Sequence, residues 1–399
     1  AALRAGWCGE ALAAARWGLV AVAESDAPLP VERLLAAAAH AALALGTPAS
    51  LTCALTELGR WGDADPGSTT AASAWAATAA LLEAVRRDAE EGTGAAADAL
   101  LLPLGDPVLE GARRDLLEAW ARLRDPHGAA VFADPTPTDL RRRLRGEARL
   151  RVALGRHDDA ATFYARALHA DACHGDPERG EASAADERIH LELAEALLEA
   201  GASTDAAREG ARVAAFAQHR RLPLLAAHAT WIGRASAYQA GTLLAADPGF
   251  VEQVAALGVA WLTARVCLTE AASAWRSSRY DDAARLARQA VAAEPSAGPV
   301  TTLARALELA CADNILEDAA YALADAADVL PDPAIGLQVR GLVALALPDH
   351  GAALLPGAEA LAARAGRLGE IRGVLSGAEA VAFCRAGARR RPGPPARRG

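Results

Sequence analysis

Apolar residues recur at helical spacing along much of this chain. One series has separations of alternately three and four positions, at Val254, Leu257, Trp261, Ala264, Leu268, Ala271 and Trp275. That period places the series on one face of a helix, with Glu252, Arg265 and Glu270 off it. We therefore predict one long helix here that packs on a neighbour. A cofactor pocket between the two tryptophans is the alternative reading.

A shorter pattern follows at residues 277–295, SSRYDDAARLARQAVAAEP. Ala283, Ala287 and Ala290 share one helical face, because residues three and four apart are neighbours. Small side chains there let a partner helix approach closely. Pro295 ends the helix, since proline lacks an amide hydrogen and clashes with the preceding turn. We expect the aromatic ring of Tyr280, or that of Tyr164 in the copy described next, to fill the wedge beside these contacts.

The same frame recurs elsewhere in the chain. Around Gly155 it reads GRHDDAATFYARAL, with the three face positions at Ala160, Tyr164 and Ala167. Around residues 313–333 it reads DNILEDAAYALADAADVLPDP, with the face and closing proline at Ala319, Leu323, Ala326 and Pro331. A weaker copy starts at Gly201, with Ala206 in the first alanine position and Leu193 and Leu197 on the preceding helix.

Equivalent points at residues 155, 201, 278 and 314 lie 46, 77 and 36 residues apart. Two units fit the interval of 77 residues. Periods of roughly 34–47 residues are typical of paired-helix solenoids. We therefore predict an all-α fold, a right-handed solenoid of antiparallel helix pairs.

These residues resemble the tetratricopeptide family, most clearly at 144–170 and 264–331. The resemblance lies in the second helix of each motif, with its paired alanines and closing proline. The first helix lacks a clear Trp-Leu-Gly-Tyr series, and the spacing is longer than in that family. The resemblance implies a tetratricopeptide-like superhelix with a concave groove for a protein or peptide partner, or for a small effector.

Proline and glycine mark the boundaries. Those at 125–138 suggest a division into less regular N-terminal helical repeats at 1–134 and tetratricopeptide-like repeats at 135–383. Helices are predicted near 1–23, 30–45, 49–60, 70–91 and 106–124. The Arg/Pro/Gly-rich tail, 384–399, is predicted to be disordered.

Composition agrees with an all-α class. Hydrophobic residues make up 52% of the 399 residues but aromatics only 4%, so alanine and leucine, both strong helix formers, carry the apolar content. All 41 basic residues are arginine, which indicates a GC-rich, bacterial genome. The absence of methionine indicates a processed chain or a piece of a longer one.

The net charge and the cysteines indicate which partners and which cellular compartment suit this chain. A net charge of −9 argues against direct nucleic-acid binding by this region. The six cysteines are far apart and read as reduced, buried residues. Apolar runs are too short for a membrane span, and the N-terminus lacks a signal-peptide pattern. We expect a cytoplasmic protein without a membrane segment.

Catalytic motifs are missing from the sequence. A Walker loop needs a lysine, and the chain has none. Asp158-Asp159 and Asp281-Asp282 could form a metal–diphosphate site, but each pair starts a helix, where carboxylates favour the positive end of the dipole. His169, Cys173 and His174 are potential metal ligands without an evident fourth. We predict no enzyme activity, no cofactor and no metal.

Three arginines form a line at i, i+4 and i+8, Arg141, Arg145 and Arg149. Like charges at this spacing repel one another on a helix unless acidic residues pair with them. Glu147 and the acidic stretch at 178–187 are candidates within the chain. The alternative is a face for an anionic partner.

Two classes of function remain. Several short segments resemble the large LuxR-type (MalT-like) transcription regulators of actinobacteria. They are LALGTP, LPLGDP, HRRLPLLA and the closing ARRRPGPPARRG. In that family an ATPase domain precedes a tetratricopeptide-like region and a helix-turn-helix follows, so the resemblance implies a partner- or effector-sensing middle region. A free-standing repeat scaffold explains the same residues. The other class is an all-helical enzyme with a buried hydrophobic cavity.

Overall fold

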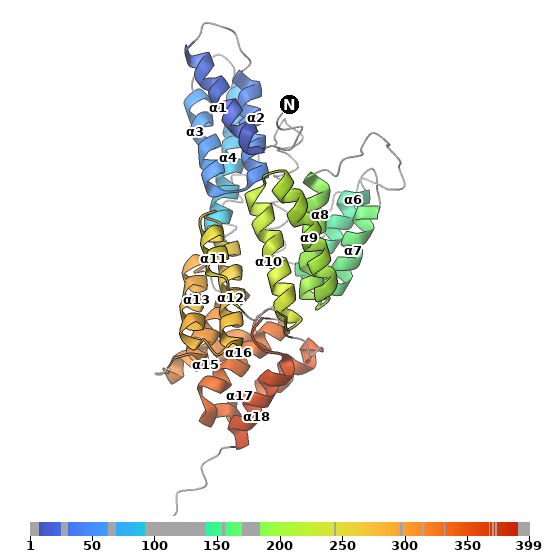
Figure 1. Cartoon of the computed structure of the whole chain (residues 1–399), viewed down its shortest axis with the longest axis vertical. Coiled ribbons are helices and arrows are strands. Elements are labelled where there is room, and N and C mark those ends of the chain that lie inside the picture. The colour runs from blue at the N-terminus through green and yellow to red at the C-terminus, as the bar shows by residue number, and fades with distance from the viewer. Residues whose placement is uncertain are drawn as a thin grey trace, which may run out of the picture. The chain divides into compact units, whose positions relative to one another are not determined.

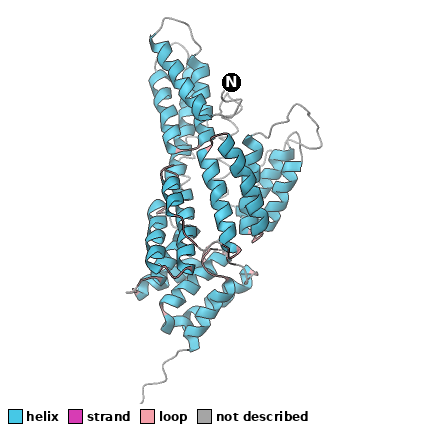
Figure 2. Ribbon diagram, viewed as in Figure 1, coloured by secondary structure: helices cyan, strands magenta, loops and turns pink. Residues whose placement is uncertain are grey.

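The computed structural model of the chain is helical (Figures 1 and 2). It describes residues 8–24, 31–62, 69–91, 140–153, 156–169, 184–242, 245–295, 298–312, 315–330, 332–366, 368, 371 and 373–389. Within these ranges the sole β contact is an isolated antiparallel bridge between Ile371 and Ser376. The predicted all-α class is confirmed.

The helices of the N-terminal half are α1 (Cys8–Glu24), α2 (Val31–Leu45), α3 (Pro48–Gly62), α4 (Thr69–Glu91), α6 (Leu140–Ala153), α7 (His157–His169), α8 (Ala184–Glu199) and α9 (Ser203–His219). Those that follow are α10 (Pro223–Gln239), α11 (Pro248–Ala255), α12 (Ala260–Arg276), α13 (Tyr280–Ala293), α14 (Pro299–Ala310), α15 (Glu317–Asp328), α16 (Pro333–Ala346), the short 3₁₀ helix η4 (Pro348–His350), α17 (Gly351–Ala365) and α18 (Gly377–Arg389).

Four N-terminal helices lie where the sequence predicted them, as α1 to α4. The fifth predicted helix, at 106–124, lies outside the described residues. Several helices begin at a proline, at Pro48, Pro223, Pro248, Pro299 and Pro333. Proline suits the first helical position, because its missing N–H has no intrahelical partner there.

The prediction of one long helix over 254–275 is wrong. The chain turns after α11, and α12 begins at Ala260. Gly258 lies in this turn with φ +70°, a left-handed conformation that glycine adopts at little cost and that ends a helix. The apolar spacing continues through the break, which is why periodicity alone did not reveal it.

The predicted disordered tail begins too early. Helix α18 continues to Arg389, and Cys384 within it is fully buried. Residues 390–399 lie outside the described part of the chain.

The described contacts divide the chain into two compact units. Unit 1 comprises Ala1–Ala200, Asp205–Gly233 and Gln253–Trp261, and unit 2 comprises Gly201–Thr204, Arg234–Glu252 and Leu262–Gly399. Unit 1 therefore includes residues on both sides of the predicted boundary near 134, and that boundary itself lies outside the described residues.

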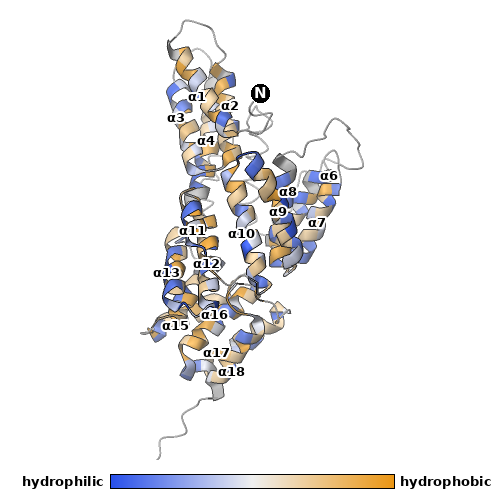
Figure 3. Ribbon diagram, viewed as in Figure 1, coloured by the Kyte–Doolittle hydropathy of each residue, from blue (hydrophilic) through white to orange (hydrophobic). Residues whose placement is uncertain are grey.

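Unit 1 packs its helices in sequence order, α1 on α2, α2 on α3, α3 on α4, and α7 between α6 and α8. Its buried clusters consist mainly of leucine and alanine. Apolar and polar residues are interleaved along the helices, as expected for helices with buried and exposed faces (Figure 3).

Unit 2 is organised around α16. This helix packs against α14, α15, α17 and α18, and its residues from Gly336 to Ala344 are all buried. Two of these buried residues, Gln338 and Arg340, are polar. Arg340 donates to the Asp328 carboxylate of α15, whereas Gln338 serves the site described below.

No described helix has both the length and the apolarity that a membrane crossing requires.

Candidate functional site

A short segment between α17 and α18, Gly373–Ser376, is held by side chains of several helices of unit 2. The side chains of Val374 and Leu375 are fully buried. Gly373 has φ +138°, and a Cβ atom there would lie 2.9 Å from both Gln338 Oε1 and Leu303 Cδ2. The helices thus approach this segment so closely that its first residue must be glycine.

Polar side chains bind the main chain of this segment. Gln338 Oε1, in the middle of α16, accepts hydrogen bonds from Val374 N at 2.7 Å and Leu375 N at 3.1 Å. The Val374 carbonyl oxygen accepts one from Tyr238 Oη at 3.0 Å and one from Arg276 Nη2 at 3.2 Å. We call Tyr238, Arg276 and Gln338 the main-chain clamp.

Three helices position the clamp. Tyr238 lies in the last turn of α10 and Arg276 is the last residue of α12, where a cation is favoured by the helix dipole. Gln338 is 1% exposed, and an unpaired amide there would be costly, so its contacts fix its orientation.

An acidic residue completes the charge balance of the clamp. Glu379 in α18 pairs with Arg276 through contacts of 3.1 and 2.8 Å. Its Oε2 also accepts from Ser376 N at 2.7 Å, and Ser376 Oγ accepts from Glu379 N at 3.2 Å. This reciprocal pair is a capping box that starts α18 immediately after the held segment.

The clamp shifts two pKa values. Burial would raise the pKa of Glu379, but hydrogen bonds from Ser376 and Arg276 lower it below its usual range. Burial raises the pKa of Tyr238 to about 12. At neutral pH Glu379 is therefore a carboxylate, and Tyr238 is a neutral phenol that donates a hydrogen bond to the Val374 carbonyl oxygen.

A second network in unit 2 joins α10 to α12. Glu270, only 1% exposed, accepts from Arg234 Nε at 2.6 Å and Nη2 at 2.7 Å, and from Asp247 N at 2.7 Å. The sequence placed Glu270 off the apolar face, and it is buried nonetheless because α12 packs on more than one side. This network is saturated by the chain's own groups and fixes the start of α11.

The predicted small-residue faces are buried in three helices. Ala160, Tyr164 and Ala167 are at most 2% exposed in α7, and Ala206 is fully buried in α9. In α13 all three alanines of the pattern are fully buried, Ala283, Ala287 and Ala290. Tyr280, in contrast, is 51% exposed, so only Tyr164 fills a wedge between helices and the expectation for Tyr280 is wrong.

The predicted register in α15 is wrong by one residue. Ala319 is exposed and Leu323 and Ala326 are half-buried, whereas Ala320, Ala324 and Ala327 are at most 1% exposed. The buried row keeps the same spacing and consists of alanine only. At its end α16 approaches closely, because a Cβ atom on Gly336 would lie 2.5 Å from the Ala327 carbonyl oxygen.

Of the glycines and prolines that begin or end the repeated pattern, two lie within the described residues. Gly201 follows α8 with φ +81°, and α13 ends at Ala293, two residues before the exposed Pro295. Gly155 and Pro331 lie outside the described residues.

The arginine line of α6 is paired within unit 1. Arg145 Nη2 and Arg149 Nη2 each donate to Glu192 Oε1 of α8 at 2.6 Å. Burial would raise the pKa of Glu192, but the two arginines hold it far below its usual range. Glu147 instead pairs with Arg151 at 2.8 Å. Arg145 and Arg149 therefore serve helix packing, and Arg141 lies half-buried one turn before them.

The two aspartate pairs lie in separate units, each in the first turn of its helix. Asp159 pairs with Arg156 at 2.6 Å, and Asp282 with Arg285 at 3.1 Å. His169 is exposed at the end of α7, and Cys173 and His174 lie outside the described residues.

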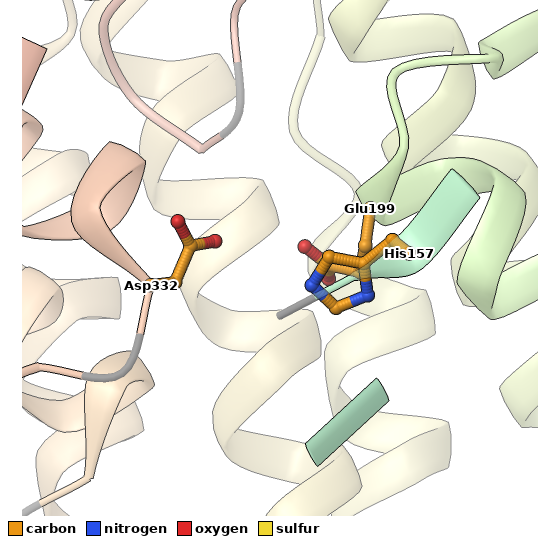
Figure 4. Close-up of side chains that lie close together, drawn as sticks. All are labelled: His157, Glu199 and Asp332. Atoms are coloured by element: carbon orange, nitrogen blue, oxygen red, sulfur yellow. The ribbon is translucent and has the colours of Figure 1, made fainter. Parts of the chain in front are cut away.

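Another group of potential metal ligands is shown in Figure 4, His157, Glu199 and Asp332. His157 and Glu199 belong to unit 1, whereas Asp332 belongs to unit 2. Asp332 Oδ1 caps α16 by accepting from Ala334 N at 2.8 Å. Two ligand-type residues in one unit are too few for a protein metal site, and we assign none to this group.

A groove of about 630 Å³ lies between α17 and α18 in unit 2. Alanine, valine and leucine provide most of its lining, and Glu359 and Arg385 lie at 3.4 Å from each other within it.

Comparison of the chain with family models, with curated proteins and with solved structures gave no match. The main-chain clamp is thus assigned from its geometry. A sequence signal for it exists in hindsight, because Gln338 and Arg340 interrupt the otherwise apolar α16.

Proposed function

We propose that this chain is a non-catalytic interaction module built as a tetratricopeptide-like solenoid of antiparallel helix pairs. The packing order in unit 2 supports the solenoid. Alternate helices pack together, α14 on α16 and α16 on α18, while α13, α15 and α17 each pack on the helix that follows. Such nearest-neighbour contacts are typical of stacked helix pairs.

The buried rows support the same architecture. The second helices of successive pairs carry buried residues at i, i+4 and i+7, in α13, α15 and also α17, where they are Leu354, Ala358 and Leu361. Ala206, Gly210 and Val213 repeat the spacing in α9. Between α9 and α13 the chain forms α10, α11 and α12, so the long sequence interval has room for a further helix pair.

The main-chain clamp is the observation that carries a binding function. Its groups bind the N–H and C=O groups of Val374 and Leu375, in a segment where the chain bends. Main-chain groups give affinity and the side chains beside them give preference when a protein recognises a peptide. We infer that the module binds a peptide segment of a protein partner.

The setting that we favour is the sensing region of a bacterial LuxR-type regulator, in which ATP and DNA functions belong to other parts of the protein. A free-standing repeat scaffold is the alternative. Reading the gene on both sides separates them: an upstream Walker loop or downstream helix-turn-helix supports the regulator, and independent start and stop codons support the scaffold.

Buried carboxylates argue against the all-helical enzyme. Among the described residues, the carboxylates of Glu57, Glu187 and Glu270 are at most 7% exposed, and each contacts an arginine, Arg16, Arg212 and Arg234 respectively. General acid–base catalysis needs a carboxylate within hydrogen-bond reach of a substrate, whereas these carboxylates contact arginines of the chain itself.

Panning a random-peptide phage library against the full chain tests the proposed function. We expect enriched peptides that bind the wild-type chain, lose binding to Gln338→Ala and keep binding to Gln289→Ala, an exposed glutamine of α13. Circular dichroism confirms that both variants are folded. A library without any enriched sequence would contradict the interaction module.

A further inference from the structure

We propose that the groove between α17 and α18 binds a free amino acid with a long apolar side chain. The groove shares no residue with the main-chain clamp, so this inference goes beyond the peptide binding proposed above. Three features identify the occupant: the shape of the groove, its apolar lining and its one pair of opposite charges.

The groove is a trough with two different ends. Helices α17 and α18 pack side by side (Figure 1). At one end Ala378 N donates to the Leu368 carbonyl oxygen at 2.8 Å, and at the other Arg385 Nη2 donates to Glu359 Oε1 at 3.4 Å. The α18 wall runs from Ala378 to Ala386, so the trough is about 12 Å long. One end is therefore apolar and the other is charged.

Between its ends the trough is apolar and open to solvent. Three alanines of its α18 wall are exposed, Ala378, Ala382 and Ala386. Their small side chains leave room for an added apolar chain, and a volume of about 630 Å³ is in the range of small-molecule sites. An apolar chain laid along the trough covers these methyl groups and removes them from water.

The charged end presents both signs to a ligand. Arg385 and Glu359 are 58% and 53% exposed, and their contact of 3.4 Å is longer than the 2.6 Å contacts of Arg145 and Arg149 with Glu192. Among the described residues Glu359 is the only polar partner of Arg385, and it takes one of the five guanidinium donors. The other donors and the second Glu359 oxygen can therefore bind a ligand.

An amino acid is the occupant whose charges match this end. Its carboxylate and ammonium groups are attached to one carbon atom, so its opposite charges are close together, like those of Arg385 and Glu359. The carboxylate accepts hydrogen bonds from the guanidinium, and the ammonium group donates to the Glu359 carboxylate. Each contact is weak at an exposed position, but together they hold the α-carbon at the charged end, from which the side chain follows the trough.

Ligands with a single charge, or with none, fit this end less well. A carboxylate alone is repelled by Glu359, and an amine alone is repelled by Arg385. An uncharged apolar ligand makes no contact with the ion pair. Affinity should therefore require both charges, and it should rise with the length of the side chain because each buried CH₂ group adds to it.

The experiment titrates the full chain with ligands and measures binding by saturation-transfer NMR. The main probe is L-2-aminooctanoic acid, which has an unbranched hexyl side chain. We expect the probe to bind with a Kd of about 1 mM or lower, and at least about tenfold more tightly than alanine. Octanoic acid and octylamine each carry one of the two charges, and should bind at least about threefold more weakly than the probe.

Substitutions at exposed residues of the groove locate the site. Arg385→Gln and Glu359→Gln should each weaken binding of the probe about two- to fivefold. Ala382→Trp fills the trough and should remove detectable binding. Arg364→Gln changes an exposed arginine of α17 outside the groove, and this matched control should bind like the wild type. Circular dichroism confirms that each variant is folded.

Three results would overturn the proposal. One is a Kd above about 1 mM for the probe on the wild-type chain. Another is unchanged binding to Ala382→Trp, which would place the ligand elsewhere. The third is binding of octanoic acid or octylamine as tight as that of the probe, because the groove would then select an apolar chain and not an amino acid.

The proposed function is tested separately. Enrichment of Gln338-dependent peptides in the phage library would support it whether or not the amino acid binds, since Gln338 lies outside the groove.

Discussion

The two units use polar groups in different ways. In unit 1, Arg145 and Arg149 share the Glu192 carboxylate, so side chains of one helix satisfy a side chain of another. In unit 2, Gln338 and Tyr238 bind main-chain atoms of a segment that is not helical. The first arrangement depends on the identity of the paired side chains, whereas the second depends on the course of the main chain. The proposed peptide recognition therefore rests on unit 2, whereas the ion pairs of unit 1 join helices to each other.

The largest effect on stability is expected from a tyrosine that is buried in unit 1 and whose counterpart in unit 2 is exposed. Tyr164 is 2% exposed in α7 and Tyr280 is 51% exposed in α13. Tyr164→Ala should lower the free energy of unfolding by about 3–5 kcal/mol, because it leaves a cavity. Tyr280→Ala should change it by less than about 1 kcal/mol. Urea unfolding of both variants measures this, and equal losses would contradict the packing of α7.

The next effect tests the main-chain clamp. Gln338→Ala leaves the N–H groups of Val374 and Leu375 buried without their acceptor, which should cost about 2–4 kcal/mol. Gln289→Ala, the matched exposed substitution, should cost less than about 0.5 kcal/mol. If thermal unfolding shows the two variants to be equally stable, Gln338 does not hold the segment.

A smaller effect tests the shared carboxylate of unit 1. Glu192→Gln keeps the shape of the side chain but removes its negative charge between Arg145 and Arg149. We expect the free energy of unfolding at pH 7 to fall by about 1–2 kcal/mol, since these three side chains are partly exposed. The folded-state pKa of Glu192 is lowered, so its stabilisation is present above the usual value of 4.5 and is lost as pH falls through the folded pKa. The difference between variant and wild type should shrink in acid. A difference independent of pH would contradict the ion pair.

The smallest effect at neutral pH concerns Tyr238. Tyr238→Phe removes one of two donors to Val374 and should cost about 1 kcal/mol. Its folded-state pKa is raised to about 12 from 10.0, so the wild type loses stability as pH rises from 10 towards 12. Chemical unfolding at pH 7, 10 and 11.5 should show that Tyr238→Phe lacks this alkaline loss. A parallel decline in both proteins would place the tyrosine outside the clamp.

The helical class and the small-residue faces of α7 and α13 could be predicted from sequence, because spacing and side-chain size determine them locally. The register of α15 could not be predicted, because two neighbouring rows of residues have the same spacing. The row that starts at Ala319 was chosen because its distance to Pro331 matches the distance from Ala283 to Pro295. Which row is buried depends on the close approach of Gly336, a contact between two helices.

The candidate site was not predicted. Gln338, Tyr238 and Arg276 lie far apart in the chain, and only their tertiary arrangement brings them to one segment. The local signal was the pair Gln338 and Arg340 in an otherwise apolar helix. Likewise Glu270 seemed to lie on a solvated face, because periodicity counts one buried face and α12 has more than one.

Amide hydrogen exchange of the wild-type chain tests the central claim most directly. If Gln338 holds the segment, the amides of Val374 and Leu375 are protected in the wild type and exchange faster in Gln338→Ala, by more than those of Leu342 and Val343 in α16. Equal exchange of the Val374 and Leu375 amides in the wild type and in the variant would contradict the main-chain clamp.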